Sequence, residues 1–182
     1  EIHKQVMEKI IKPTIDGLKS EGITYKGFLY AGLMIKNSEI SVLEFNCRFG
    51  DPETQPILMR MESDLAEICL LAARGNLNER EISWTKDSAL GVVIASKGYP
   101  FEYEKNKEIN NLENENSRQK VFHAGTKTQE GKVLSNGGRV LCVTALGSTL
   151  LDSKNLAYQK VKNIDWKDGF YRDDIGDKAI KS

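Results

Sequence analysis

The sequence has little of what marks a secreted or membrane-bound protein. Only three of its 182 residues are cysteines (Cys47, Cys69 and Cys142), and no cluster of cysteine and histidine has the spacing of a zinc site. A sparse, odd set of cysteines is typical of a reducing compartment rather than of a disulfide framework. An apolar run of membrane length and a signal-peptide pattern are both missing. We therefore expect a cytoplasmic protein with no membrane partner.

Net charge is absent as well. Lysine and arginine number 26, aspartate and glutamate number 26, and the formal charge is zero. Proteins that bind nucleic acid usually carry an excess of basic residues, so we expect no nucleic-acid partner. With 40% hydrophobic and 29% charged residues, the composition is that of a globular protein with a real core.

The hydrophobic pattern of the first part predicts helix, hairpin and helix. Pro13 disturbs the first helix, and Asp51 is a good N-cap for the last segment, with Pro52 at its first position. Because the chain starts at Glu1 directly in a helical pattern, we expect it to be a piece of a longer protein. The predicted elements are a helix over residues 1–20, strands over 23–35 and 40–46 around a turn at 36–39, and one or two helices from 52 to Gly75.

The second part has the pattern of a β-rich domain with one helix. A polar linker at residues 79–88 separates it from residues 1–78. A capping pattern at Thr149 and Asp152 marks the start of the helix. Residues 102–120 are predicted to form a solvent-exposed loop. The predicted strands lie at 89–96, 120–126 and 138–147, with a hairpin-type turn at 135–138 before the last of them. The fold class is therefore α+β, with domains at 1–78 and 89–182.

The stretch "LEFNCRFGDPETQP", residues 43–56, has an unusual density of polar groups where a strand meets a helix. Alternation along a strand places Glu44 and Asn46 on one face, with Arg48 next in phase if the strand continues. The other face carries Leu43, Phe45 and Cys47, which suits packing. Carboxylate and amide oxygens are ligands that Mg²⁺ prefers. A solvated hairpin edge, with its charges paired to each other, explains the same pattern.

Seven blocks along the chain resemble glycinamide ribonucleotide synthetases, the ATP-grasp family also called phosphoribosylamine–glycine ligases. They are "GFLYAGLMI", "VLEFNCRFGDPETQP", "SDLAEICLLAARG", "LGVVIASKGYP", "VFHAGT", "NGGRVLCVTALG" and "FYRDDIG". The resemblance implies the C-terminal part of an ATP-grasp domain over residues 1–78. It also implies a small β-rich, barrel-like (hybrid-motif) domain with one helix over residues 89–182.

The resemblance further implies an enzyme of purine biosynthesis that joins glycine to 5-phosphoribosylamine. The expected cofactors are ATP and Mg²⁺, with Mn²⁺ as an alternative ion. The glycine carboxylate would attack the γ-phosphoryl group, and the amine would displace phosphate from the resulting acyl phosphate. Positioning and charge neutralisation supply most of such catalysis. The glycine-rich lid and ATP-binding lysines of ATP-grasp enzymes have no match here, so we expect an inactive isolated chain whose partner is the missing remainder of the enzyme.

The family's motifs also imply roles for individual residues. Glu44 and Asn46 match the metal ligands, and Arg48 matches a position that holds the glycine carboxylate or acyl phosphate, which makes it the candidate catalytic residue. Met34 would lie against the adenine. At Gly32 many ATP-grasp proteins carry a further acidic ligand, which this chain lacks.

Two further residues are candidate substrate-binding groups. Asp51, with Glu53, is a candidate contact for the substrate amine, although an N-cap explains Asp51 equally well. Arg172 in "YRDDIG" is a candidate phosphate contact. A surface salt bridge to Asp173 or Asp174 is the alternative for Arg172.

Two other functions remain open at this point. One is another ATP-grasp carboxylate–amine ligase, such as a biotin carboxylase relative, which shares the Glu-x-Asn-x-Arg arrangement. The other is a non-catalytic binding or assembly module, favoured by the absent lid. We interpret His123 as a packed, hydrogen-bonded strand histidine, Cys47 as a small core residue, and Trp84 and Trp166 as core or linker anchors.

Overall fold

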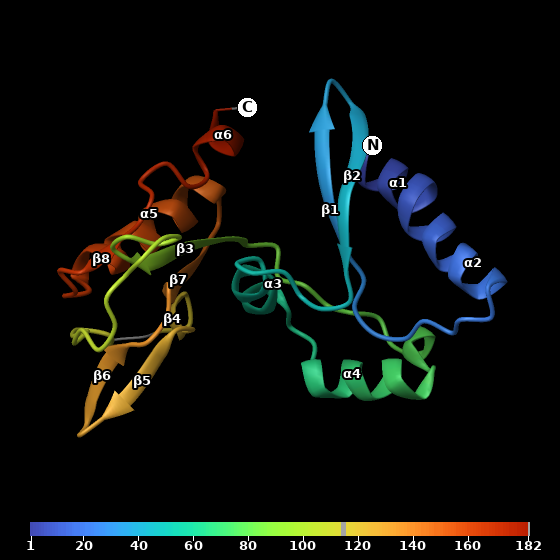
Figure 1. Ribbon diagram of the computed structural model, residues 1–182. Helices are drawn as coiled ribbons and strands as arrows, with labels where there is room; N and C mark the ends of the chain where they lie inside the picture. Colours follow the sequence, from blue (N-terminus) through green and yellow to red (C-terminus); the bar gives the residue numbers. More distant parts are fainter. Residues whose placement is uncertain (114–115, 182) are drawn as a thin grey trace. The chain divides into compact units, whose positions relative to one another are not determined.

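The computed structural model describes residues 1–113 and 116–181. Helices and strands are mixed along the chain, which confirms the α+β class. The chain divides into two compact units (Figure 1). The first unit holds residues 1–51 and 63–82, and the second holds residues 52–62 and 83–182. Residues 52–62, which belong to the predicted segment 1–78, thus cluster with the second unit. Within the described ranges, no helix is both long and apolar enough to cross a membrane.

The first unit begins with an interrupted helix. It comprises α1 (Ile2–Val6), a π-helical turn (Met7–Ile11) and α2 (Lys12–Ser20). The π turn lies just before Pro13, which has no N–H to donate to the preceding turn, so the disturbance predicted at the proline takes this form. The chain leaves α2 through Gly22, whose φ of +78° lies in the left-handed region that favours glycine.

A two-stranded antiparallel hairpin follows in the first unit. Strand β1 (Tyr30–Lys36) pairs with β2 (Glu39–Asn46), and the turn between them has positive φ at Asn37 and Ser38. The predicted strand over 23–35 was too long at its start, because residues 23–29 are outside any strand. The register skips Leu43, which is a bulge on β2. Strand β1 stays regular, so the alternation of its faces is undisturbed.

The helical segment predicted after the hairpin, as one helix or two, is present as two helices, but the Asp51 N-cap is wrong. Helix α3 (Thr54–Arg60) begins three residues later than Asp51, with Glu53 at its N-cap and no side-chain cap. Residues 51–53 form a turn instead. Helix α4 (Leu65–Arg74) is capped by Asp64, which accepts from the Glu67 N–H at 3.0 Å. It ends at Gly75 with φ +84°, the C′ glycine that was predicted.

The second unit is built on a four-stranded antiparallel sheet in the order β4-β7-β3-β8, with β4 and β8 at its edges. Leu90, Val92 and Ile94 of β3 share one face with their partners on β7, and this face joins the buried core with α5 (Leu150–Asn163), which runs alongside in Figure 1. On the other face a Cβ at Gly91 would lie 3.4 Å from Pro56 of α3. The sheet is therefore packed on both faces. The strands are β3 (Ser88–Ser96), β4 (Gln119–His123), β7 (Arg139–Gly147) and β8 (Gly169–Phe170).

One predicted turn of the second unit is wrong. Residues 135–138 join β6 (Lys132–Ser135) to β7, and these two strands do not pair with each other. The hairpin is formed instead by β5 (Thr126–Gln129) and β6, around Glu130 and Gly131 with φ of +52° and +77°. The sequence pattern at 135–138 is rich in glycine, but glycines there allow close approach: a Cβ at Gly137 would lie 3.0 Å from Gly125.

The helix predicted from Thr149 is confirmed with its capping box. Thr149 Oγ1 accepts from the Asp152 N–H at 3.1 Å, and the Asp152 carboxylate accepts from the Thr149 N–H at 3.1 Å. Ala157 and Val161 of α5 lie in the core, and Leu150 and Ile164 pack against it. A short helix, α6 (Asp177–Ile180), ends the described chain, and a single 3₁₀ turn (Leu77–Glu79) follows α4.

Candidate functional site

The β1–β2 hairpin brings three of the predicted site residues onto one face. Gly32 pairs directly with Glu44, and Tyr30 pairs with Asn46, so these four residues share a face. Met34 follows Gly32 by two positions on the regular strand and therefore lies on the same face. Its thioether side chain is 56% exposed. The sequence predicted this grouping for Glu44 and Asn46, and the register adds Met34 to it.

The Glu44 and Asn46 side chains contact each other. The amide nitrogen of Asn46 donates to Glu44 Oε1 at 3.1 Å. In this orientation the amide oxygen of Asn46 and the second carboxylate oxygen of Glu44 are left as acceptors on the same face. Two hard oxygen ligands suit a Mg²⁺ ion that takes its remaining ligands from phosphates and water. The described residues hold no cluster of three or more His, Cys, Asp or Glu that would form an all-protein metal cage.

The absence of a side chain at Gly32 leaves space for the Glu44 side chain. A Cβ at position 32 would lie 3.0 Å from Cγ of Glu44, which is closer than side chains normally approach. Any side chain here, including the acidic ligand that the resemblance associates with this position, would force Glu44 to move. The sequence alone showed only that position 32 lacked a ligand. The cross-strand register shows that the glycine also sets the position of the Glu44 side chain.

Arg48 and Asp51 follow the hairpin in the same unit. Strand β2 ends at Asn46, so Arg48 is in a bend and not in phase with Glu44 as the sequence suggested. One guanidinium nitrogen of Arg48 donates to the Phe49 carbonyl at 2.9 Å. The remaining N–H groups of this exposed side chain are available to a carboxylate or phosphoryl group. Asp51 is exposed.

The other face of the hairpin is more open than predicted. Leu43 is 64% exposed, Phe45 is 43% exposed, and Cys47 is exposed as well, so the interpretation of Cys47 as a core residue is wrong. β1 and β2 pair only with each other in the described chain, so no further strand extends this sheet.

Arg172 belongs to the second unit and has a well-defined partner there. Its guanidinium donates two parallel hydrogen bonds to the Asp174 carboxylate, at 2.8 and 2.7 Å. This contact lowers the pKa of Asp174 and raises that of Arg172. One of the two salt bridges considered from the sequence is therefore present, and it is bidentate.

Tyr158 holds the segment around Arg172, and sequence reasoning missed it. Its hydroxyl donates to the Arg172 carbonyl at 2.6 Å and accepts from the Ile175 N–H at 3.1 Å. Burial raises the pKa of Tyr158. No sequence signal identified this residue, because its partners are backbone groups 14 and 17 positions further along the chain.

Gln55 in α3 is a second residue that was missed. Its side-chain carbonyl oxygen is buried and has no hydrogen-bond partner within the described ranges. A buried acceptor without a donor is costly, so a bound N–H donor would stabilise it. The sequence signal was present, since Gln55 lies inside the quoted "GDPETQP" block.

The residues interpreted as structural behave in different ways. Trp166 is buried in the core of the second unit, as predicted. Trp84 is 43% exposed and forms an isolated backbone bridge with Met61, which fits a linker anchor. The Nδ1 of His123 lies 3.1 Å from the Thr126 hydroxyl, so His123 is hydrogen-bonded as expected, but its side chain is exposed and the expectation that it is packed is wrong.

Two family models match consecutive parts of the chain. "Phosphoribosylglycinamide synthetase, ATP-grasp (A) domain" matches residues 1–54, and "Phosphoribosylglycinamide synthetase, C domain" matches residues 89–178. A crystal structure of phosphoribosylamine–glycine ligase from Thermotoga maritima superposes with a TM-score of 0.82 at 35% identity. That match covers 93% of this chain and 42% of the solved one.

The chain is also similar to curated phosphoribosylamine–glycine ligases. The protein from Pasteurella multocida is 50% identical over 181 residues, and the one from Vibrio cholerae is 52% identical over 182 residues. Each alignment covers 99% of this chain but 42% of the relative, so the chain spans less than half of their length. Two consecutive domain models of one family, and relatives aligned along nearly the whole sequence, show that the chain belongs to the phosphoribosylglycinamide synthetase family, with part of its ATP-grasp domain and its C domain.

Proposed function

We propose that this chain is part of a cytoplasmic phosphoribosylamine–glycine ligase of purine biosynthesis. The observation that carries the proposal is the alignment of 99% of the chain with ligases of that name at 50% identity or more. In this proposal residues 1–78 contribute to the ATP-grasp domain, residues 89–182 form the C domain, and residues 79–88 link them. The substrates are glycine, 5-phosphoribosylamine and ATP.

The hairpin face is the part of the nucleotide site that this chain supplies. Glu44 and Asn46 would hold Mg²⁺, which neutralises phosphate charge when it is bound. Their preformed contact supports this role, because it fixes two oxygen ligands in advance. Met34 on the same face would pack against the adenine ring.

Substrate binding falls to Arg48, Arg172 and two groups near α3. Arg48 would hold the glycine carboxylate with its planar fork while a carboxylate oxygen attacks the γ-phosphorus and ADP leaves. The amine nitrogen of phosphoribosylamine then attacks the acyl carbon, phosphate leaves, and the nitrogen loses a proton. Asp51 and the unsatisfied oxygen of Gln55 are suited to N–H donors of the substrates. Arg172 would bind the ribose phosphate by exchanging its bond to Asp174 for bonds to phosphate oxygens.

The partner of the chain is the part of the enzyme that it does not span. Besides Met34, four apolar side chains of the hairpin are at least 40% exposed, and exposed apolar side chains that lie together normally pack against protein. They are Ile35, Val42, Leu43 and Phe45. The isolated chain is therefore expected to have no ligase activity and to bind MgATP weakly, since it supplies one wall of the site.

The test is a chimera that joins the unspanned part of the Vibrio cholerae relative to this chain. We expect ADP release that requires both glycine and phosphoribosylamine. ADP release that another carboxylate supports as well as glycine would favour a different ATP-grasp ligase. For the isolated chain, calorimetry is expected to show weak MgATP binding, and tight binding would contradict the requirement for the rest of the enzyme. A chimera that folds but shows no glycine-dependent turnover would overturn the proposed function.

A further inference from the structure

Lys160 is a buried cation in the second unit. It lies on α5 between core residues, and only 5% of it is exposed. Its ammonium group donates to the backbone carbonyl of Glu113. Among the described residues, no carboxylate lies within ion-pair distance of it, and it is the one charged residue that is buried. An ammonium has three N–H donors, and burying the charge without a counter-ion is unfavourable.

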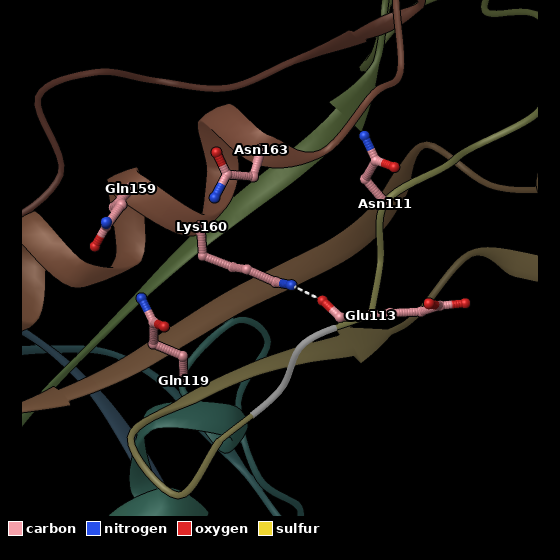
Figure 2. Close-up of a pocket in the computed structure, with 6 residues that line it drawn as sticks. All are labelled: Asn111, Glu113, Gln119, Gln159, Lys160 and Asn163. Carbon is pink, nitrogen blue, oxygen red and sulfur yellow. Dashed lines mark hydrogen bonds between the residues drawn. The ribbon is translucent and has the colours of Figure 1, made fainter.

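The Lys160 ammonium lies at a polar cavity of about 470 Å³ (Figure 2). Four amide side chains surround it. Gln119 is fixed, because its amide nitrogen donates to the Leu156 carbonyl at 2.8 Å and its oxygen accepts from Asn116 at 3.1 Å. The other three have no side-chain hydrogen bond to any part of the chain that the structure describes, so their N–H groups are free to bind. The lining residues are Asn111, Glu113, Gln119, Gln159, Lys160 and Asn163.

Two charged residues of opposite sign, Lys160 and Glu113, line the cavity. In Figure 2 the Glu113 side chain points away from the Lys160 ammonium, and the contact between the two residues is made by the Glu113 carbonyl. A cation with spare donors, in a cavity that amide side chains also line, is suited to oxygen atoms that carry negative charge. Amides can also accept, so hydroxyl groups of the same ligand would find partners.

We propose that this cavity binds a small oxyanion, a compound with a phosphate or carboxylate group whose oxygens contact Lys160. The site does not depend on the proposed ligase function, because none of its residues belongs to the hairpin or to the segment around Arg172. A ligand here would bridge α5 to the segment that carries Asn111 and Glu113. It would therefore stabilise the second unit as well as bind to it.

Titrating the ¹⁵N-labelled 182-residue chain with inorganic phosphate, ribose 5-phosphate and succinate tests the proposal. We expect saturable shifts in the amide signals of α5 and of Gln119 with at least one of these probes. Phosphate and succinate distinguish the two oxyanion classes. Glycerol serves as the neutral probe, and equal binding of glycerol would overturn the assignment to an oxyanion. The absence of saturation with all three anions would overturn the site.

A matched pair of lysine variants separates the site from general electrostatics. Lys160→Met keeps the apolar stem and removes the charge, and we expect binding to weaken about tenfold to a hundredfold. Lys162→Met removes the same charge from an exposed position of α5, and binding should be unchanged. Equal losses of affinity in the two variants would show that anion binding depends only on the net charge of the chain.

A third variant keeps the proposal testable if Lys160→Met fails to fold. Asn163→Asp introduces a carboxylate three residues after Lys160 on the same helix, where side chains are neighbours. The new carboxylate would occupy the position of the anion. We therefore expect a higher melting temperature and loss of anion binding, and unchanged anion binding would contradict the proposal.

Discussion

The hairpin of the first unit and the sheet of the second unit are both antiparallel, but their side chains are buried to very different extents. Val92, Val140 and Val143 of the sheet are completely buried, whereas Leu43 of the hairpin is 64% exposed. The sheet has α5 on one face and α3 on the other, whereas the hairpin consists of two strands that pair only with each other in the described chain. The second unit therefore has a buried core, whereas the hairpin of the first unit has an exposed surface. The polar residues proposed for catalysis are concentrated on the hairpin.

The largest effect is expected from truncating equivalent leucines in these two regions. Leu141 of β7 is 1% exposed, and Leu141→Ala should lower the free energy of unfolding by about 2–5 kcal/mol. Leu43→Ala in the isolated chain should change it by less than about 0.5 kcal/mol, because Leu43 is mostly in solvent already. Urea denaturation followed by fluorescence reports on the second unit, since Trp84 and Trp166 both belong to it.

Far-UV circular dichroism of the same samples follows both units. Similar losses for the two leucine variants would mean that the hairpin is covered in solution. In the chimera, where the remainder of the enzyme is present, Leu43→Ala should become destabilising if that remainder packs on the hairpin. A Leu43 variant that stays neutral in the chimera would contradict the proposed partner.

The next effect is on turnover. In the chimera, Glu44→Ala should lower kcat by about 10²–10³-fold, because phosphate charge in the transition state is then poorly neutralised. Unfolding should change little, since Glu44 is exposed and contributes no core. Glu39→Ala is the matched control, an exposed acid at the other end of β2. Normal turnover of the Glu44 variant across a magnesium titration would remove Glu44 from the metal site.

A smaller effect is expected at Arg172. Arg172→Ala should raise the KM for phosphoribosylamine about tenfold to a hundredfold, with the KM values for glycine and ATP nearly unchanged. Arg172→Lys should recover part of the loss, because a point charge cannot replace the planar fork. Arg118→Ala is the matched control, since it removes another exposed salt bridge of the second unit, to Asp87 at 3.3 Å.

The alternative for Arg172 predicts a different result. If the guanidinium serves only the bond to Asp174, its loss should leave all three KM values unchanged. The free energy of unfolding would then fall by at most about 1 kcal/mol, the usual contribution of an exposed ion pair. Steady-state kinetics with each substrate varied in turn, together with a melting curve, distinguishes the two.

The sequence predicted the sheet and the helix of the second unit better than the hairpin of the first unit. The α5 helix, its capping box and the strands β3 and β7 were found because apolar periodicity and capping residues are local signals. The hairpin faces were misjudged, since alternation says which residues share a face but not whether anything covers it. That is why Cys47 was taken for a core residue.

Long-range contacts explain most of the remaining differences. The glycine-rich stretch at 135–138 was predicted to be a hairpin turn, but its sequence does not show which strands pair. The hairpin is formed by β5 and β6 instead. The roles of Tyr158 and Lys160 rest on backbone groups far away in the sequence, and on a helix surface both residues look solvent-exposed. The sequence showed that position 32 lacks an acidic side chain. Its effect on the position of Glu44 became visible only from the register of the two strands. The pair Glu44 and Asn46 was predictable, because strand alternation alone places them together.

The smallest expected effect concerns the capping of α5, which distinguishes it from α3. Thr149→Ala removes the hydroxyl that accepts from the Asp152 N–H and should cost about 1 kcal/mol of stability. The matched control is Thr128→Ala, an exposed threonine of β5 outside any helix cap. The loss at Thr149 should exceed that at Thr128, and equal losses would mean that the capping box does not contribute.

The same capping box predicts a pH dependence with a definite sign. Hydrogen bonds from Ser148 and Thr149 lower the pKa of the Asp152 carboxyl below its ordinary value. A carboxyl with a lowered pKa in the folded state stabilises the fold above its unfolded pKa, near 4, and this contribution disappears as the pH falls through the folded value. Asp152→Asn removes the titrating group, so the stability difference from the wild type should be constant near neutral pH and shrink below about pH 4. Urea denaturation of both proteins between neutral and acidic pH measures that difference, and a difference that stays constant into the acidic range would exclude the ionised carboxylate as the source of the cap's stability.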